Sequence, residues 1–376
     1  MNTILFYIWY RLVGSLFIFF PIKKNRVVFS YFFGKGFGDS VKYISNELLE
    51  RKEFDIVWMV KDKNTKGFPD GVKRIKRGTL AELYYLSTAK VWVDNSRKPF
   101  GLKKRKGQFY IQTWHSSLRL KKIEKDAENY MDPGYIRTAK SDSKMIDLIT
   151  SGCHFSTNIY KNSFWYSGEV LECGTPRCDI LLSKKRSDVF REKICKLYGL
   201  DSSKKIVLYA PTFRKDMVFD NRYLDCEKLS KMLGSKYEVM MKLHPHMSNI
   251  EAKSGVVNAS KYPDMQELIC AVDYLITDYS GCCFDMMIAK KPCVLYVPDL
   301  KQYLKTEREL YFSFDELPFE KTTNMDELVN TIKRFDEEKY SKNIQSFSKK
   351  IGLCESGSAT KIIADLISKK CKGDNE

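Results

Sequence analysis

Histidine is scarce in this sequence, with four residues in 376. The eleven cysteines are odd in number, contain no Cys-x-x-Cys pair, and show no Cys/His spacing that resembles a zinc ligand set. No cleavable secretory signal is present, so we expect reduced thiols in the cytosol rather than a disulfide framework. No carboxylate cluster suggests a metal site, and we expect neither a metal nor another cofactor.

Acidic residues are too few to balance the basic ones. The chain has 47 Asp and Glu against 64 Lys and Arg, which gives a formal net charge of +17. Such a charge suits a polyanionic partner: nucleic acid, anionic lipid or a phosphate-rich substrate. We do not expect nucleic acid, because the aromatic residues follow strand and core patterns and are not interleaved with Lys and Arg on one face.

Long apolar runs are missing except at the N-terminus. Residues Ile4 to Ile22 are almost wholly apolar or aromatic, interrupted chiefly by Arg11, and a basic cluster begins at Lys23. The central arginine disfavours a spanning helix, whereas the aromatic residues and the basic cluster suit attachment in the plane of an anionic membrane surface. We therefore expect a peripheral or monotopic protein at the cytoplasmic face of the cell membrane. A buried first helix and a true span remain open alternatives.

Short apolar strands alternate with helical segments along the rest of the chain, a pattern typical of parallel sheets with crossover helices. In the first half we predict strands at 25–31, 54–60, 91–94, 108–113 and 168–172, helices at 41–51 and 79–90, and helical sequence from 121 to 166. In the second half we predict strands at 205–209, 237–243, 273–277 and 292–297, helices at 265–271 and 281–289, and a helical tail at 324–369. The length fits two domains of roughly 150–200 residues. We predict an α/β fold in which an apolar segment (1–24) precedes two Rossmann-like domains (25–185 and 186–376) that face a central cleft.

Three of the four histidines lie in two short motifs, Gln112-Thr-Trp-His115 and Lys242-Leu-His244-Pro-His246. Each motif follows a predicted buried strand, and open α/β sheets bind ligands at the carboxyl ends of their strands. His115 is a candidate general base because the pKa of imidazole lies near neutrality; a strand-end histidine satisfied by a backbone group is the alternative. His244 and Lys242 can present an imidazole and a cation to phosphates from a turn that the proline stiffens, and His246 is the more expendable histidine.

Further candidate residues for the donor side follow strands of the second half. Thr212 and Arg214 offer a hydroxyl and a guanidinium to phosphate oxygens, although this motif taken alone favours an arginine on a solvated loop. A second set opens the helix predicted after strand 273–277, where backbone N–H groups favour phosphate: Thr277, Asp278, Ser280 and Gly281, with Asp285 inside the helix. Asp278 suits a ribose hydroxyl or a structural cap better than a phosphate.

Candidates for the acceptor side lie in the first half. The turn that contains Gly34, Lys35, Gly36 and Asp39 follows the first strand and matches neither a dinucleotide nor a Walker fingerprint. Two residues at later strand ends, Asn95 and Trp114, are expected beside it. Arg177 lies near the predicted hinge, where it either reaches the cleft on the donor side or pairs with Asp179.

Together these motifs resemble the CDP-glycerol:poly(glycerophosphate) glycerophosphotransferase family of teichoic-acid and capsule enzymes. The resemblance extends from about Asn25 to Leu366 and rests on the order and spacing of seven motifs. They are Gly34-Lys-Gly-Phe-Gly-Asp39, Asp94-Asn-Ser-Arg97, Gln112-Thr-Trp-His115, Gly174-Thr-Pro-Arg177-x-Asp179, Tyr209-Ala-Pro-Thr-Phe-Arg214, His244-Pro245 and Thr277-Asp-Tyr-Ser-Gly281 with Phe284-Asp285. One position departs from the family pattern, because Ser116 follows His115 where glycine is usual.

The resemblance implies a GT-B-like fold, membrane association and a CDP-alcohol donor held mostly by the C-terminal domain. It further implies that His115 is the catalytic base and that His244 contacts the donor pyrophosphate, with help from Arg214, Thr277, Asp278 and Ser280. The expected reaction transfers a polyol phosphate from CDP-glycerol or CDP-ribitol to a lipid-linked saccharide or polyol-phosphate acceptor and releases CMP. The alternatives are a glycosyltransferase of the same fold that uses a nucleotide sugar, a sugar-nucleotide epimerase, and a polyanion-binding protein without catalysis.

Overall fold

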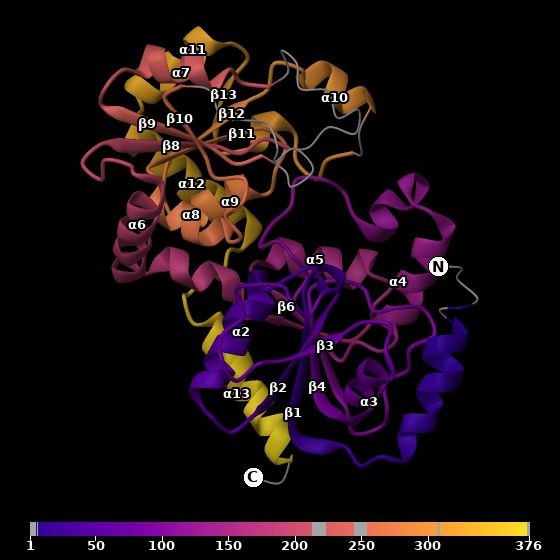
Figure 1. The fold of residues 1–376 in the computed structure, drawn as a ribbon. Helices are drawn as coiled ribbons and strands as arrows, with labels where there is room; N and C mark the ends of the chain where they lie inside the picture. The colour runs from indigo at the N-terminus through magenta and orange to yellow at the C-terminus, as the bar shows by residue number, and fades with distance from the viewer. Residues whose placement is uncertain (1–4, 6, 213–222, 244–253, 307–308, 374–376) are drawn as a thin grey trace. The chain divides into compact units, whose positions relative to one another are not determined.

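The computed structural model describes residues 5, 7–212, 223–243, 254–306 and 309–373 (Figure 1). The chain forms two compact units. Unit 1 comprises Met1–Ser117, Ile123–Asp179 and Cys354–Glu376, and unit 2 comprises Leu118–Lys122 and Ile180–Leu353. The expected continuous domains 25–185 and 186–376 therefore need correction, because the last helix packs within unit 1 and a five-residue segment after His115 packs within unit 2.

Unit 1 is built on a seven-stranded parallel sheet with the order β3-β2-β1-β4-β5-β6-β7. The strand order changes direction between β1 and β4, and in open α/β sheets ligands bind beyond the carboxyl ends of strands at such a switch point. The strands are β1 (Lys23–Ser30), β2 (Asp55–Val60), β3 (Lys73–Lys76), β4 (Ala89–Asp94), β5 (Phe109–Gln112), β6 (Leu148–Ser151) and β7 (Glu169–Glu172).

Helices cover both faces of this sheet, which explains why its central strands are apolar on both sides. They are α2 (Asp39–Glu50), α3 (Leu80–Thr88), α4 (Pro133–Ser143), α5 (His154–Ser163) and α13 (Ala359–Lys372), together with the short helices η3 (Phe32–Gly34) and η4 (Glu124–Tyr130). The short helix η5 (Pro176–Leu182) begins in unit 1 and ends in unit 2. On one face, Ile363 and Ile367 of α13 are fully buried against Val27 and Val91. On the other face, Trp92 packs with Leu83 and Leu86 of α3.

Unit 2 repeats the plan with a six-stranded parallel sheet of order β10-β9-β8-β11-β12-β13. Its strands are β8 (Lys205–Tyr209), β9 (Tyr237–Met241), β10 (Val256–Asn258), β11 (Tyr274–Thr277), β12 (Cys293–Tyr296) and β13 (Glu320–Thr322). Its helices are α6 (Lys184–Tyr198), α7 (Cys226–Leu233), α8 (Met265–Ala271), α9 (Cys282–Ile288), α10 (Leu300–Thr306), α11 (Met325–Lys333) and α12 (Glu337–Ile351), with η7 (Phe314–Glu316). The predicted α/β class with parallel sheets is confirmed.

The apolar N-terminal segment forms η1 (Ile8–Val13) and η2 (Gly14–Phe19), which lie beside α3. One side is held by the core: Tyr10 is buried, and its hydroxyl donates a 3.1 Å hydrogen bond to Glu82. The other side exposes large apolar side chains, with Leu16 at 65% and Phe19 at 85%. Among the described residues, no helix has the length and apolar character needed to cross a bilayer.

Candidate functional site

Three loops at the carboxyl end of the unit 1 sheet bring aromatic and polar side chains together. They follow β1, β4 and β5 and carry Phe32, Asn95 and His115. The Asn95 side-chain oxygen accepts a 2.9 Å hydrogen bond from the backbone N–H of Phe32. The centroids of the Phe32 and His115 rings lie 5.0 Å apart. His115 thus emerges at the predicted place, at the end of a buried strand and next to the switch point.

The imidazole of His115 is oriented by a backbone group. Its Nδ1 lies 2.9 Å from the carbonyl oxygen of Asn95, and a carbonyl oxygen only accepts hydrogen bonds. The neutral ring must therefore carry its proton on Nδ1, which leaves the lone pair on Nε2. This contact is the backbone interaction that a purely structural histidine would make, and it is equally the contact that prepares Nε2 to accept a proton.

Strained backbone gathers in these same loops. Phe32, Phe33, Asp39 and Trp114 all have positive φ, between 39° and 59°. Non-glycine residues in the left-handed region cost roughly 1–2 kcal/mol each and persist only where the surroundings enforce them. Half of the eight positive-φ non-glycine residues of the described chain are found here. Strain of this kind concentrates at binding and catalytic sites.

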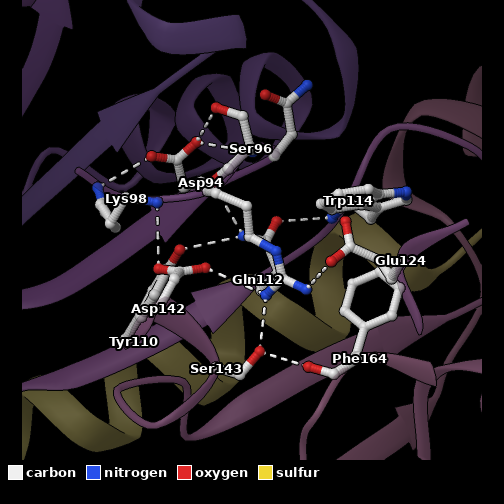
Figure 2. Close-up of polar contacts among 12 residues, drawn as sticks. Asp94, Ser96, Lys98, Tyr110, Gln112, Trp114, Glu124, Asp142, Ser143 and Phe164 are labelled. Carbon is white, nitrogen blue, oxygen red and sulfur yellow. Dashed lines mark hydrogen bonds and ion pairs between the residues drawn. The ribbon is translucent and has the colours of Figure 1, made fainter. Parts of the chain in front are cut away.

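Gln112 enforces the turn at Trp114 (Figure 2). Its side-chain oxygen accepts from the Trp114 backbone N–H at 2.9 Å. Its side-chain nitrogen donates to the Ser96 carbonyl at 3.1 Å and to the Tyr110 hydroxyl at 3.0 Å. Because Gln112 is fully buried, this amide ties the loop after β5 to the loop after β4. We did not assign it a role from the sequence, although it lies within the quoted histidine motif.

A buried charged cluster supports the same loops (Figure 2). Arg97 forms ion pairs with Glu124 at 2.7 Å and with Asp142 at 3.3 Å, and all three side chains are at most 1% exposed. Burial raises the pKa of Asp142 to about 6, although Arg97 opposes that rise. Lys98 pairs with Asp94 at 3.0 Å. Glu124 and Asp142 come from a polar, helical stretch that carries no recognisable motif, so sequence reasoning did not find them.

Arg177 was expected on the donor side, but it lies beside the acceptor-side residues. Its Nη1 donates to the His115 carbonyl at 3.2 Å and lies 3.5 Å from Asp39, whose carboxylate also accepts from the Asn95 side-chain amide at 3.2 Å. The Asp179 carboxylate caps α13, because it accepts from the backbone N–H groups of Ala359 and Thr360 at 3.2 and 2.7 Å.

The glycine-rich turn after β1 lies at the same edge. Gly34 has φ +85°, and a Cβ there would lie 2.9 Å from the Arg77 side chain, so glycine is required. Lys35 is exposed, whereas Gly36 is buried but unstrained. The acceptor-side candidates Gly34, Lys35, Gly36, Asn95 and Trp114 thus belong to the three loops around His115, and Asp39 begins α2 directly after the first of these loops.

In unit 2, several predicted donor residues hold the fold of the strand ends. The Thr277 hydroxyl donates to the Ala210 carbonyl at 2.6 Å, and Asp278 accepts from the Thr212 backbone N–H at 2.7 Å. Asp285 is 1% exposed and accepts from the Gln266 amide at 3.0 Å. These contacts are structural in kind, and they fix the loop that opens α9.

The N-terminus of α9 remains the more open part of that edge. Ser280 and Gly281 are partly exposed, and the Ser280 hydroxyl accepts from the Cys282 N–H at 3.4 Å. Lys242, after β9, is partly buried, and its ammonium donates to the Tyr262 carbonyl at 2.5 Å. Burial lowers the pKa of Lys242 to about 8.

His244, His246 and Arg214 lie outside the described residues, so their predicted roles stay predictions. Among the residues that are described, no group of three His, Cys, Asp or Glu side chains is arranged to hold a metal ion.

Comparison with known proteins gives a consistent result. The family model for CDP-glycerol:poly(glycerophosphate) glycerophosphotransferase matches residues 12–369. A teichoic acid poly(glycerol phosphate) polymerase of Bacillus spizizenii is 32% identical, covering 95% of both chains. A teichoic acid glycerol-phosphate transferase of Staphylococcus aureus is 30% identical over 92% of this chain and 94% of the relative. The polymerase of Staphylococcus epidermidis is also 32% identical, but this chain spans only about half (51%) of its length.

A comparison with solved structures points to the same family. The wall teichoic acid polymerase TagF superposes with a TM-score of 0.87 at 31% identity, covering 97% of this chain and 94% of that one. A UDP-GlcNAc 2-epimerase from Neisseria meningitidis superposes with a TM-score of 0.56 at 10% identity, over 92% of this chain and all (100%) of that one. At that identity the epimerase shares the fold alone.

Proposed function

Because the chain belongs to the CDP-glycerol:poly(glycerophosphate) glycerophosphotransferase family, we propose that it transfers glycerol phosphate from CDP-glycerol to a hydroxyl of a lipid-linked acceptor and releases CMP. The carrying observation is His115, presented at a sheet switch point with its Nδ1 held by the Asn95 carbonyl. Glycerol is the favoured polyol because relatives named for glycerol phosphate are 30–32% identical, whereas a poly(ribitol-phosphate) polymerase and a ribitol-phosphate primase are 28% and 27% identical. One structure of TagF, from crystals soaked with CDPG, has a TM-score of 0.87 and 29% identity to this chain.

In the proposed mechanism, Nε2 of His115 takes the proton from the acceptor hydroxyl as its oxygen attacks the phosphorus that bears glycerol. The new bond joins the acceptor oxygen to that phosphorus, and the bond from phosphorus to the CMP oxygen breaks. A base placed this way contributes roughly 10²–10⁴-fold to the rate. Negative charge then develops on the departing CMP phosphate, where fixed cations and backbone N–H groups stabilise it most effectively.

The donor side of the proposal lies in unit 2, the second Rossmann-like unit of a GT-B-like fold. Ser280 and Gly281, which immediately precede α9, offer a hydroxyl and backbone N–H groups to a phosphate. His244 and Arg214 are assigned to the pyrophosphate by their motifs, and Lys242 adds positive charge. The described contacts of Thr277, Asp278 and Asp285 support a role in holding the loop rather than the phosphate itself.

The membrane part of the proposal is peripheral attachment at the cytoplasmic face through the N-terminal segment. Its inner side chains are held by α3, while Leu12, Leu16 and Phe19 are 59%, 65% and 85% exposed. Apolar side chains next to Lys23 and Lys24 suit an anionic lipid surface. Sedimentation with vesicles tests this. We expect Leu16→Glu combined with Phe19→Glu to reduce binding to phosphatidylglycerol vesicles at least tenfold, and unchanged binding would refute the assignment.

The central experiment measures CMP release with CDP-glycerol and CDP-ribitol offered separately, in liposomes that contain a lipid-linked saccharide acceptor. His115→Gln is the test variant. His154→Gln is the matched control, because His154 lies in the same unit, has a side chain that is 65% exposed and contacts Glu172 at the surface. We expect acceptor-dependent CMP release that falls at least 100-fold in His115→Gln and persists in His154→Gln. Consumption of a UDP-sugar in place of either CDP-alcohol would instead identify a glycosyltransferase.

A further inference from the structure

A buried arginine lies directly against the aromatic residue that supports His115. The side chain of Arg97 is 1% exposed, and its guanidinium carbon lies 5.4 Å from the centre of the Trp114 ring. The Trp114 ring in turn stacks on the His115 ring, with centroids 4.3 Å apart and an interplanar angle of 29°. Phe164 closes the group, because it meets Trp114 edge-on at 4.8 Å and lies 4.6 Å from Arg97.

The hydrogen bonds of Arg97 fix where its guanidinium can lie. One amino group meets Glu124 at 2.7 Å, and the other meets Ser143 at 2.9 Å and Asp142 at 3.3 Å. These partners come from η4 and α4, so the guanidinium is anchored to elements outside the histidine loop. A planar guanidinium can satisfy divergent partners at its edge while its flat face covers an aromatic ring, which a lysine ammonium cannot do.

Stability alone gives a weak reason for this arrangement. Buried ion pairs are often no more stabilising than apolar residues of the same volume, and their retention is best explained where they fix a particular geometry. The geometry at stake here is that of Trp114, whose backbone is left-handed and whose indole touches the imidazole.

We propose that Arg97 is a positioning residue that acts through Trp114 to hold the His115 ring with Nδ1 toward the Asn95 carbonyl. The proposal rests on the proposed role of His115 as the base. Arg97 itself touches neither substrate nor reacting atoms. It restricts the imidazole to the orientation in which Nε2 is the basic atom.

The test variant is Arg97→Lys, and Arg26→Lys is its matched control. Arg26 is also buried in unit 1, pairs with Asp55 at 2.8 Å and lies 4.4 Å over the Tyr85 ring. It lies in the first half of β1, toward the amino ends of the strands, whereas His115 follows the carboxyl end of β5. The same substitution therefore removes the same kind of contacts at both places, and only one of them lies near the histidine.

Two measurements report on His115. Nitrogen-15 NMR of histidine-labelled protein, assigned with the His115→Gln variant, gives the tautomer directly. We expect the Nδ1–H tautomer in the unmodified protein and in Arg26→Lys, and a mixture of both tautomers in Arg97→Lys. Transfer assays should show kcat reduced about 10- to 100-fold in Arg97→Lys, the size of effect that a small displacement of a catalytic group produces, with KM for CDP-glycerol unchanged.

Trp114→Phe tests whether Arg97 acts on His115 through the Trp114 ring. It also gives a second measurement if the Arg97→Lys variant is too unstable to study. It should give the same mixture of tautomers, and adding Arg97→Lys to it should change kcat less than twofold further. If Arg97→Lys loses stability as Arg26→Lys does yet keeps the tautomer and kcat, the proposal is wrong. A predominant Nε2–H tautomer in the unmodified protein also overturns it. Because the tautomer is read without substrate, absence of transfer from CDP-glycerol would refute the proposed function and leave the positioning role to be decided by NMR.

Discussion

Replacing Lys242 with methionine should change how the stability of unit 2 depends on pH. Burial lowers the pKa of this lysine from 10.5 to about 8, against the weaker opposing effect of Asp264. Between these two values the unfolded chain holds a proton that the folded protein has released. Stability therefore rises with pH across this window, and the penalty of charging the buried amine is fully present below pH 8.

The size of the effect follows from the shift. A difference of about 2.5 pKa units, between 10.5 and about 8, corresponds to about 3 kcal/mol at roughly 1.4 kcal/mol per unit. The Lys242→Met variant lacks this titration but also loses the hydrogen bond to the Tyr262 carbonyl. The part of that loss that does not depend on protonation cancels when the wild-type-minus-variant difference at pH 7 is subtracted from the difference at pH 10. The part that does depend on protonation is already included in the lowered pKa.

Urea unfolding at pH 7, 8, 9 and 10 provides the assay. All five tryptophans (9, 58, 92, 114 and 165) lie in unit 1, so their fluorescence follows that unit and serves as an internal reference. Far-ultraviolet circular dichroism also detects unit 2. We expect wild type to gain about 2–3 kcal/mol relative to Lys242→Met between pH 7 and 10. Parallel stability curves for the two proteins would show that the amine is not desolvated, and the reasoning from burial would fail.

Three further predictions concern unit 1 and are read from tryptophan fluorescence during unfolding. Asp179→Ala removes both hydrogen bonds that cap α13 and should cost about 1–2 kcal/mol; no change would mean that α13 needs no cap. Gly34→Ala meets a positive φ and contacts at 2.9–3.1 Å and should cost at least about 1–2 kcal/mol, whereas Gly36→Ala, with its nearest neighbour at 4.0 Å, should cost less than about 1 kcal/mol. Because burial raises the pKa of Asp142 to about 6, this group should add stability as the pH falls from 6 toward 4. Asp142→Asn should abolish that gain, and a gain that persists would assign it to another group.

The sequence predicted the central strands well because burial on both faces produces unbroken apolar runs. Strands 205–209 and 54–60 were predicted within a residue of β8 and β2. The edge strands β3, β10 and β13 were missed, since three- and four-residue edges such as Lys73–Lys76 carry no hydrophobic pattern. The strand β6 was missed for a different reason: its four residues lie within a stretch whose polar, helical character dominates the local signal.

The positions of the candidate site residues were predicted in part, for a related reason. Asn95, Trp114 and His115 were identifiable because each follows a strand, and strand ends converge in space. Arg177 was identifiable as a functional candidate, but its described contact with the His115 carbonyl depends on long-range packing that spacing does not reveal. The buried partners Glu124 and Asp142 are separated from Arg97 by 27 and 45 residues and acquire meaning only when η4 and α4 fold against it.

Helix α13 has a consequence for how the protein is made. Its buried face covers β1 and β4, yet it comes last among the helices while those strands come among the first. During synthesis on the ribosome, Val27 and Val91 lack the cover of α13 until the whole of unit 2 has been made. Domains generally fold as their chain emerges. Unit 2 is nearly continuous in sequence and is free to fold first. We therefore expect unit 2 to fold first, and unit 1, which carries His115, to be completed only once α13 has been synthesised.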